Sequence, residues 1–390
     1  MVVSNVPPIE AIAAMEAGVA RVVRRVEIYE SDGSTLWVPQ NNDLRSRLIT
    51  GSVGIDYTRS ERRILDNLEL DNRDGMLDPD SIDGFWYDKI IKPFRGIKYP
   101  KDPAPPLYEK FGIWEMQLGE FMIDRIGDAH ENTIVRISGR DYTKKCLTSK
   151  LEHSMSFPAG TYIYDLISAL AANAGIRKLR LPFVTNTIGT QLDLERGTER
   201  WAVMLQAAQS GSYDLFFDNE GYLTMAPMPD PFLDAPFMSF QSGQNLVTYE
   251  KSVNDSELYN HVIVTSNQES VEGGEVLLPY FGEAKNTDPD SPTNVDRIGD
   301  RLLPHEAAFM TSDQQCRELA EALLRVHQLE SYEINWSSIV YPHADVGKVV
   351  QVVEPKKGTA TPTKFLLDTL NLPLGLEPMS ATGKRVVITG

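Results

Sequence analysis

Apolar and polar residues alternate with a period of two over much of the chain, most clearly in the run 119–141. In this run, GEFMIDRIGDAHENTIVRISGRD, Phe121 and Ile123 alternate with Met122 and Asp124, and a second alternating segment follows in its last third. Side chains of a β-strand point alternately to its two faces, so the pattern predicts two strands. They are joined by a polar connection and end in Gly-Arg-Asp. Neither strand carries a set of residues suited to catalysis.

The same period predicts a β-rich block from residue 21 to residue 150. Strands are expected at 22–29 and 36–38, joined as a hairpin by a Ser-Asp-Gly-Ser turn, and at 53–57. Before this block, two prolines and an Ala- and Met-rich run ending at a glycine predict a short helix. It belongs to an N-terminal arm, residues 1–20, which we expect to dock on the rest of the chain or to be disordered.

Two further expectations concern the middle of this block. The strand at 64–70 is expected to place four side chains on one face, namely Ile64, Asp66, Leu68 and Leu70. The stretch 93–106 holds five prolines, and proline cannot donate a hydrogen bond to a sheet. We therefore predict a long loop there and not the continuation of a strand.

Helical spacing marks a second block, residues 151–236. Apolar residues recur every three or four positions within 161–175 and again within 198–211, which predicts two helices. A threonine before each run is the expected cap, and a glycine after each run is the expected stop. Two strands within 213–226 and a proline-rich linker complete a small α+β unit.

Strand patterns return in a third block, residues 237–390. They are expected at 259–265, 332–336, 349–353, 364–370 and 385–389. A helix is predicted at 312–329, because Ser312 and Gln315 have the spacing of a capping box and apolar residues then recur on one face. The acidic, glycine- and proline-containing stretch 269–301 is expected to be a long surface loop.

These patterns predict an α+β, mainly β chain with two β-rich domains, 21–150 and 237–390, and a small α+β domain between them. Domains of roughly 100 to 200 residues would give two to four in a chain of 390 residues. The hydrophobic fraction of 42% is typical of folded globular proteins. No secretory signal is expected in the first twenty residues, and no apolar run is long enough to cross a bilayer.

The formal net charge of −17 argues against a nucleic-acid-binding protein, because phosphate backbones are held by cations. Acidity of this size also keeps a protein soluble. The only two cysteines, Cys146 and Cys316, cannot build a disulfide framework or a cysteine-based metal site, and both are expected to be buried. We expect the chain to fold in a reducing cytoplasm.

No catalytic, cofactor-binding or metal-ligating residue is predicted. Six histidines lack helical spacing from one another and belong to no HExxH pattern: His130, His153, His261, His305, His327 and His343. The acidic turn 71–75, with Asp78 and Asp80, departs from a calcium loop because Arg73 stands where an oxygen ligand is needed. It is expected to be a solvated turn, and so is Asp288-Pro289-Asp290. Phosphate-loop, dinucleotide-binding and GxSxG patterns are absent.

Two arginine pairs, Arg24-Arg25 and Arg62-Arg63, are the local basic features of this acidic chain. We expect them to be strand-edge charges or salt-bridge partners across a subunit interface, and not a phosphate-binding patch.

Four segments together resemble hub proteins at the tail tip or baseplate of tailed bacteriophages. The run 119–141 matches their "GxFxID" and "VxxSGRD" segments, and 52–79 resembles their strand, arginine-pair and acidic-turn segment. Residues 201–221, ending in FFDNEG, are similar to the helix and hairpin of their middle domain, and 254–266 is similar to the strand that opens their second tube domain.

The resemblance implies that both β-rich domains are tail-tube-like β-barrels or sandwiches and that the chain is structural, not an enzyme. It implies a homotrimer whose six similar domains form a ring that continues the tail tube. The expected partners are distal tail or tail tube proteins, the tape measure protein and other tail-tip or fibre proteins, with DNA only in transit and no membrane insertion. The expected location is the virion tail, after assembly in the host cytoplasm.

Two expectations for residues follow from this resemblance. An acidic bore would let DNA slide without binding, and the end of the 119–141 run would lie at a subunit contact, so that Arg140→Ala impairs assembly. Two alternatives stay open. One is the distal tail ring protein, a hexamer with one such domain per chain. The other is a β-rich carbohydrate-active enzyme of the cell wall, which would need two facing carboxylates.

Overall fold

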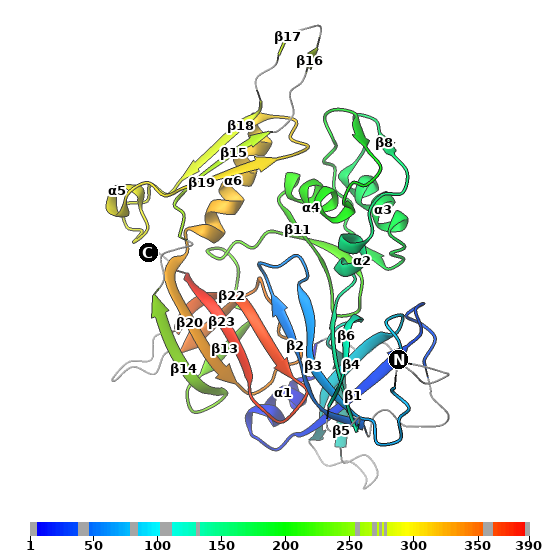
Figure 1. Ribbon diagram of the computed structural model, residues 1–390. Helices are drawn as coiled ribbons and strands as arrows, with labels where there is room; N and C mark the ends of the chain where they lie inside the picture. The colour runs from blue at the N-terminus through cyan, green and yellow to red at the C-terminus, as the bar shows by residue number, and fades with distance from the viewer. Residues whose placement is uncertain are drawn as a thin grey trace.

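In a computed structural model the chain is mainly β, and most of its strands belong to one sheet (Figure 1). The predicted α+β, mainly β class is thus confirmed. The structure describes residues 6–37, 47–78, 85–101, 111–129, 133–253, 258–266, 271–272, 275–276, 279–353 and 362–386. None of the helices in these ranges is both long and apolar enough to span a bilayer.

In its described residues, the first β part holds one helix and seven strands. They are α1 (Ile9–Glu16), β1 (Arg21–Tyr29), β2 (Leu48–Asp56), β3 (Arg63–Asp71), β4 (Ile90–Pro100), β5 (Phe111–Gln117), β6 (Phe121–Ala129) and β7 (Ile134–Arg140). Six of the strands lie in the order β1-β4-β6-β7-β3-β2, and β5 pairs with β4. The N-terminal helix docks on this part, because Ala11, Ala14 and Met15 are buried in its core.

The second β part uses six strands of the C-terminal half. They are β13 (Met238–Gln241), β14 (Leu246–Val253), β20 (Glu330–Ser338), β21 (Val349–Val353), β22 (Pro362–Pro373) and β23 (Met379–Val386). Their order is β13-β21-β22-β23-β20-β14.

The two β parts repeat one strand arrangement. Four strands of each part, taken in chain order, are β2, β3, β6 and β7 in the first part and β14, β20, β22 and β23 in the second. In both parts the first of the four pairs with the second, the second with the fourth, and the fourth with the third. The order in space is therefore β2-β3-β7-β6 in one part and β14-β20-β23-β22 in the other. A further strand pair extends both sheets beyond the third strand, β4 with β1 and β21 with β13. The pair β1–β4 is antiparallel, whereas β13–β21 is parallel.

The two parts are joined edge to edge, because β2 pairs with β22 in antiparallel register from Ser52 opposite Pro373 to Asp56 opposite Thr369. The described strands of the two β parts therefore form one 13-stranded sheet and no closed barrel, where two separate barrels or sandwiches were expected. One continuous hydrophobic core underlies both parts.

Two smaller units lie beyond the same end of the strands of this sheet, at the top of the view in Figure 1. The helical unit contains α2 (Thr143–Thr148), β8 (Met155–Phe157), α3 (Ile163–Asn173), β9 (Leu179–Arg180), β10 (Leu192–Leu194), α4 (Arg200–Ser210), β11 (Tyr213–Phe217) and β12 (Leu223–Pro227). Both predicted helices are present, and Ile163, Leu166 and Trp201 are among the buried residues. The caps are Tyr162 and Glu199, one residue after the predicted threonines, and neither side chain makes a capping bond.

The small-sheet unit is inserted between β14 and β20. It contains β15 (His261–Ser266), β16 (Val271–Glu272), β17 (Glu275–Val276), β18 (Phe281–Lys285), α5 (Val295–Ile298), β19 (Leu302–Ala307) and α6 (Asp313–His327). Helix α6 is the predicted one, and the Ser312 side chain accepts the Gln315 N–H as expected. The helix packs on the sheet β18-β15-β19, so the insertion is a helix with its own sheet.

Three sequence expectations for this architecture are wrong. The stretch 93–106 is not all loop, because β4 runs to Pro100. Pro93 is tolerated there because it stands where the partner of β4 changes from β6 to β5, and its carbonyl accepts the Leu118 N–H. Residues 102–106 lie outside the described ranges. The stretch 269–301 is not one loop, because it contains β18 and α5.

The third wrong expectation is the face of β3. A bulge at Asp66 and Asn67, where Asn67 has φ 45°, shifts the pairing with β7. Leu65, Leu68 and Leu70 are therefore the buried residues, whereas Ile64 was expected to share their face. The predicted hairpin at 22–38 is present as far as residue 37, because Leu36 forms an antiparallel bridge to Tyr29 and the Trp37 N–H donates to the Ile28 carbonyl oxygen at 2.9 Å. Val38 lies outside the described ranges.

Candidate functional site: the closing strands and the sheet edges

The run 119–141 forms β6, β7 and the turns around them. Phe121 and Ile123 are fully buried, and Ile123 lies opposite Gly139. A Cβ on Gly139 would stand 2.6 Å from the carbonyl oxygen of Met122, so only glycine fits this approach of the two backbones. The Phe, Ile and Gly of this run thus have a packing reason.

Its charged end has partners within the chain. Arg140 donates to Asp124 at 2.6 Å and to Glu61 at 2.7 Å, and its side chain is 31% exposed. Asp141 is buried and accepts the backbone N–H groups of Thr143 and Arg63, both at 3.0 Å. Burial raises the pKa of Asp141 to about 6. The Asp141 carboxylate thus connects the start of α2 to β3.

The same construction recurs in the second β part, and sequence reasoning missed it. The segments 121–124, FMID, and 138–140, SGR, correspond to 365–368, FLLD, and 382–384, TGK. In both parts the phenylalanine is fully buried, the glycine faces the buried aliphatic residue two positions later, and the aspartate occupies a bulge. In both, the aspartate pairs with the cation that follows the glycine.

The two arginine pairs stabilise contacts within the chain. Arg62 lies 3.7 Å from Asp214 and 3.8 Å from the centre of the Phe216 ring, so it joins the first β part to the helical unit. Arg63 pairs with Asp345 at 2.9 Å and thereby joins the first β part to the second. Both side chains are buried. The expectation of pairing across a subunit interface is therefore wrong for these two residues.

Arg24 and Arg25 are also held inside the chain. Arg24 donates to the carbonyl oxygens of Ile49 and Leu374 at 3.2 Å. Arg25 pairs with Glu115 at 3.0 Å and lies over the Phe94 ring. These arginines thus hold the strands of one chain together.

A buried carboxylate, Glu120, connects the first β part to the helical unit. It is 2% exposed and lies 2.9 Å from the ammonium group of Lys92. It also pairs with Lys178 and accepts the Tyr142 hydroxyl at 3.1 Å. Because removal of one partner would leave a buried charge, this network is expected to fix the orientation of the two units.

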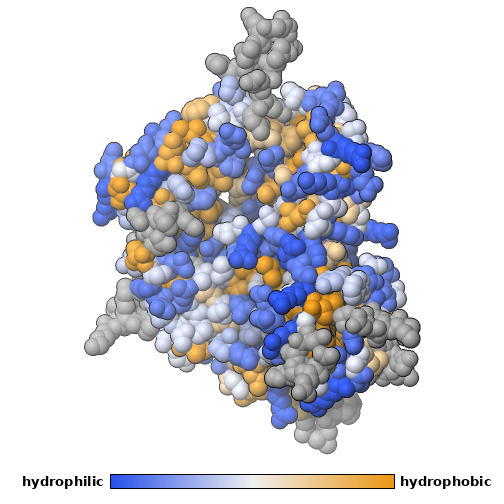
Figure 2. Space-filling model, viewed as in Figure 1, coloured by the Kyte–Doolittle hydropathy of each residue, from blue (hydrophilic) through white to orange (hydrophobic). Residues whose placement is uncertain are grey.

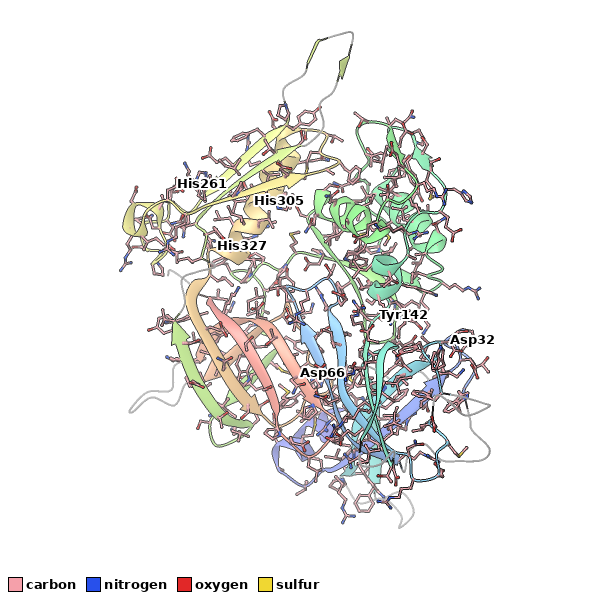
Figure 3. The ribbon with its side chains drawn as sticks, in the orientation of Figure 1. Asp32, Asp66, Tyr142, His261, His305 and His327 are labelled. Atoms are coloured by element: carbon pink, nitrogen blue, oxygen red, sulfur yellow. The ribbon has the colours of Figure 1, made fainter. Side chains whose placement is uncertain are left out.

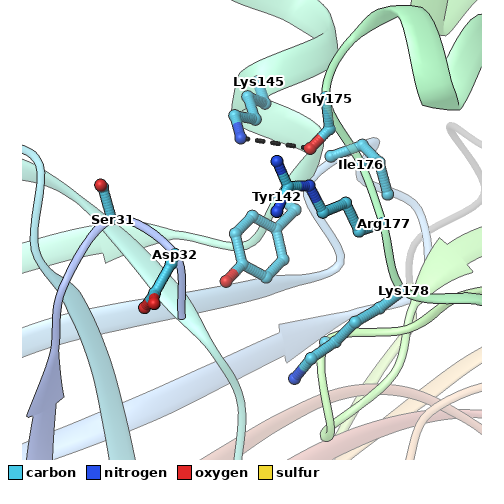
Figure 4. A pocket seen from close by; sticks show the side chains of 9 residues that line it. Ser31, Asp32, Tyr142, Lys145, Gly175, Ile176, Arg177 and Lys178 are labelled. Carbon is cyan, nitrogen blue, oxygen red and sulfur yellow. Dashed lines mark hydrogen bonds between the residues drawn. The ribbon is translucent and has the colours of Figure 1, made fainter. Parts of the chain in front are cut away.

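Beside this network lies a cavity of about 330 Å³ (Figure 4). Three cations line it, Lys145, Arg177 and Lys178, with one carboxylate, Asp32. The Lys145 ammonium group donates to the Gly175 carbonyl oxygen at 3.4 Å. Two facing carboxylates, which glycoside hydrolysis needs, do not line this cavity.

The described histidines do not meet. His261, His305 and His327 lie in the small-sheet unit (Figure 3), and the exposed His153 lies in the helical unit. His261 contacts Asp300 at 2.8 Å and Glu283 at 3.0 Å, and burial lowers the pKa of His343 to about 4. His130 lies outside the described ranges. Within those ranges, no group of three His, Cys, Asp or Glu residues is arranged to hold a metal ion.

The acidic turns are held by their own chain. Asp71 accepts the Arg73 N–H at 3.1 Å, Asn72 accepts the Leu77 N–H at 2.7 Å, and Asp74 pairs with Arg47. Asp288 accepts the Asp290 N–H at 3.0 Å. These are the hydrogen bonds of ordinary turns that contain Asp and Asn. Asp80 lies outside the described ranges.

One face of the second β part is rich in hydroxyl and amide groups. The face over β14, β20, β23 and β22 bears eight polar side chains, Thr248, Glu250, Asn335, Ser337, Thr369, Asn371, Ser380 and Thr382. Their register forms two rows across the strands. Figure 2 shows this side of the molecule, where side chains of intermediate hydropathy gather over these strands. The set includes no cation and a single carboxylate.

Comparison with solved structures finds the same fold in tail proteins. One neighbour is a 43 kDa tail protein of prophage MuSo2 from Shewanella oneidensis, with 10% identity, a TM-score of 0.58, and coverage of 93% of this chain and 98% of the neighbour. Another is a tail protein from Neisseria meningitidis MC58, with 13% identity, a TM-score of 0.58, and coverage of 93% and 96%. No family model matches the sequence, and no curated protein does. The chain has, over nearly its whole length, the fold of these two tail proteins.

Proposed function

We propose that the protein is a structural component of a phage virion, the hub of the tail tip or baseplate. In this proposal three copies form a ring with pseudo-sixfold symmetry that continues the tail tube and lets DNA pass. The observation that carries it is the repeated strand arrangement, β2-β3-β7-β6 and β14-β20-β23-β22. The fold shared with the two tail proteins supports it.

The repeat explains how one chain could adapt a sixfold tube to a threefold tip. Ring closure requires unlike edges that fit each other around an axis. Each chain supplies two similar parts joined through one such contact, β2 with β22. Three chains would then supply six similar parts and six similar contacts, three of them within chains and three between chains.

Only the face of the sheet that points away from the hydrophobic core could line a bore. Strands β1, β4, β5, β13 and β21 and helix α1 pack on the core side. The hydroxyl- and amide-rich face is the opposite side, and we propose that it faces the DNA. The eight side chains named above include no cation, so they offer phosphates no partner. In this proposal the wall of the bore is close to neutral where the second β part forms it. It is less acidic than the bore that we expected from the net charge of −17.

The remaining assignments belong to the same proposal. The domains are an arm, 1–20, tube-like domains 21–150 and 237–390, and a middle domain, 151–236. The partners are further copies of the chain, distal tail or tail tube proteins, the tape measure protein and other tail-tip or fibre proteins. We place the protein in the virion tail, assembled in the host cytoplasm, without enzymatic activity.

The repeat also separates the hub from its rivals. A distal tail ring protein would need one tube-like domain per chain, whereas this chain has two similar β parts. A glycan hydrolase would need paired carboxylates, whereas the cavity beside Glu120 is lined by one carboxylate, Asp32, and the hydroxyl- and amide-rich face has one, Glu250. Turnover of cell-wall glycans by the purified protein would overturn the hub proposal in favour of an enzyme.

The experiment for the hub is the mass of the purified protein in solution, measured by light scattering over a range of concentrations. The proposal predicts a species of three copies. A species of six copies would favour the distal ring, and a single copy at every concentration would contradict a ring built by this chain alone.

A further inference from the structure

Two edges of the 13-stranded sheet have no partner among the described strands. One edge is that of β14, which within the described ranges pairs with β20 and, at its first residue, Leu246, forms a single bridge to Ser242. The other belongs to β6 after Met122, because β4 covers only Phe121 and Met122. The six strands β7, β3, β2, β22, β23 and β20 lie between β6 and β14, so the two edges are at opposite ends of this path.

These edges correspond to the two that already meet inside the chain. In the repeat, β14 takes the place of β2 and β6 takes the place of β22. The first half of β22 pairs with β21 and its second half with β2. The start of β6 likewise pairs with β4, while its second half lacks the partner that β2 provides in the other part.

The registers carry this correspondence to single residues. Leu65 and Ile334 both stand opposite the glycine of the repeated motif, so Val53, opposite Leu65, matches Lys251, opposite Ile334. One residue later in β2 and in β14, Gly54 matches Ser252. Two residues further on, Ile55 matches Val253.

The partner strand is matched in the same way. Both motifs place a bulge after the residue opposite the glycine, so Leu370 matches Ile126 and Asn371 matches Gly127. Ile55 lies opposite Leu370 at the contact inside the chain. The matching pair at the two open edges is therefore Val253 and Ile126.

The side chains at the β2–β22 contact are buried, whereas those on the open edge of β14 are exposed. Ile55 is 1% exposed and Leu370 is 2% exposed, because β2 and β22 cover each other. Val253 is 64% exposed, and Val247 on the same strand is 60% exposed. A strand edge with exposed valines invites pairing with another strand and is seldom left open in a soluble protein.

We infer that β14 of one copy pairs in antiparallel register with the second half of β6 of the next copy, with Val253 opposite Ile126. This inference rests on the proposed ring and names its contact between copies. The contact is heterologous and repeats the β2–β22 contact, so three copies close a ring of two-part chains.

A pair of engineered cysteines tests this register. Directly opposed residues of antiparallel strands have Cα atoms about 4.5 to 5.5 Å apart, within the range that a disulfide spans. The double variant Val253→Cys with Ile126→Cys is oxidised and run on a non-reducing gel. The natural cysteines, Cys146 and Cys316, are fully buried and present in every sample. We expect bands of two and three copies that disappear on reduction.

The matched control is Val253→Cys with Gly127→Cys. A one-residue shift turns a side chain to the other face of a strand, and a Cβ on Gly127 meets no atom within 4 Å, so this variant should fold. It is expected to give far less crosslinked species. The two single variants Val253→Cys and Ile126→Cys should give no three-copy band.

The outcomes separate this contact from the proposed ring. If the wild-type protein has the mass of three copies but the Val253–Ile126 variant crosslinks no better than its control, the ring stands and this contact is wrong. If the wild type has the mass of one copy and the variant does not crosslink, both fail. A closed three-copy species in the variant supports the contact whatever the wild-type mass.

Discussion

Replacement of the two glycines of the repeated motif, Gly139 and Gly383, by alanine tests most directly whether close packing of the strands requires them. Gly139→Ala places a Cβ 2.6 Å from the Met122 carbonyl oxygen and 3.3 Å from the Phe121 Cβ. The first contact is with backbone of the paired strand, so β6 and β7 must separate. Overpacking of this kind costs about 1 to 3 kcal/mol of the free energy of unfolding. We expect Gly139→Ala to lie in the upper part of that range.

Two further glycines calibrate the effect. In Gly383→Ala the nearest atom is the Leu366 carbonyl oxygen at 3.0 Å, so the strands need to shift less and the expected loss is about 1 kcal/mol. In Gly127→Ala no atom lies within 4 Å of the new Cβ. Removal of a glycine from the unfolded chain then stabilises the protein by about 0.4 to 1 kcal/mol. The predicted order of stability is Gly127→Ala, wild type, Gly383→Ala, Gly139→Ala.

Urea unfolding followed by tryptophan fluorescence and by far-UV circular dichroism measures these differences. Trp336 lies in the shared core and its ring stands 3.2 Å from the position of a Gly383 Cβ, so fluorescence reports on this region. Midpoints are compared at equal slopes. If Gly139→Ala unfolds at the same urea concentration as Gly127→Ala, the two strands do not approach as described and the packing explanation of the motif is refuted.

Three other predictions follow from single side chains. Arg140→Ala should impair ring formation. The pair that matches Arg140–Asp124 in the second β part, Lys384–Asp368, lies beside the β2–β22 contact, so Arg140 should lie beside the equivalent contact between copies. The control Arg136→Ala on the same strand should form the ring, and equal masses of the two variants by light scattering would contradict the prediction. The native state binds the Asp141 proton more tightly than the unfolded state, so its contribution to stability is largest at low pH and is lost as pH rises through about 6; relative to Asp141→Asn, the wild type should gain about 2 kcal/mol between about pH 7 and pH 4 in urea titrations, and no change would refute it. Thr382→Lys should make the ring retain duplex DNA, with a salt slope of up to about 3 for three copies, whereas equal retention by wild type would show that the face is not inert.

Residue patterns predicted most elements but not how their edges meet. The alternation in 119–141 and the helical spacing in 161–175 report burial on one face, which local sequence does encode. The β2–β22 contact joins residues more than three hundred positions apart, and nothing in either strand indicates its partner. Two separate β domains were therefore expected in place of one shared sheet.

Errors arose where backbone geometry broke the simple period. The bulge at Asp66 and Asn67 puts Leu65, not Ile64, on the buried face, because one extra residue reverses every later side chain. The prolines of 93–106 predict a loop, but Pro93 stands within β4 at a change of partner, where its missing N–H is tolerated. Both effects depend on the neighbouring strand.

The repeated motif was within reach of the sequence. FMID and SGR in the first half have counterparts in FLLD and TGK near the end of the chain. The similarity is short and the cation changes from Arg140 to Lys384, so single letters do not reveal it. Only the shared register, with a bulge after Ile123 and after Leu367, shows that the two sets are equivalent.

Electron microscopy of the purified protein tests the central claim most directly. The account predicts a ring with threefold symmetry and six similar β parts, in which the contacts between copies repeat the β2–β22 contact. A ring of six copies, or three copies that meet through the helical or small-sheet units and leave β14 and β6 uncovered, would contradict it.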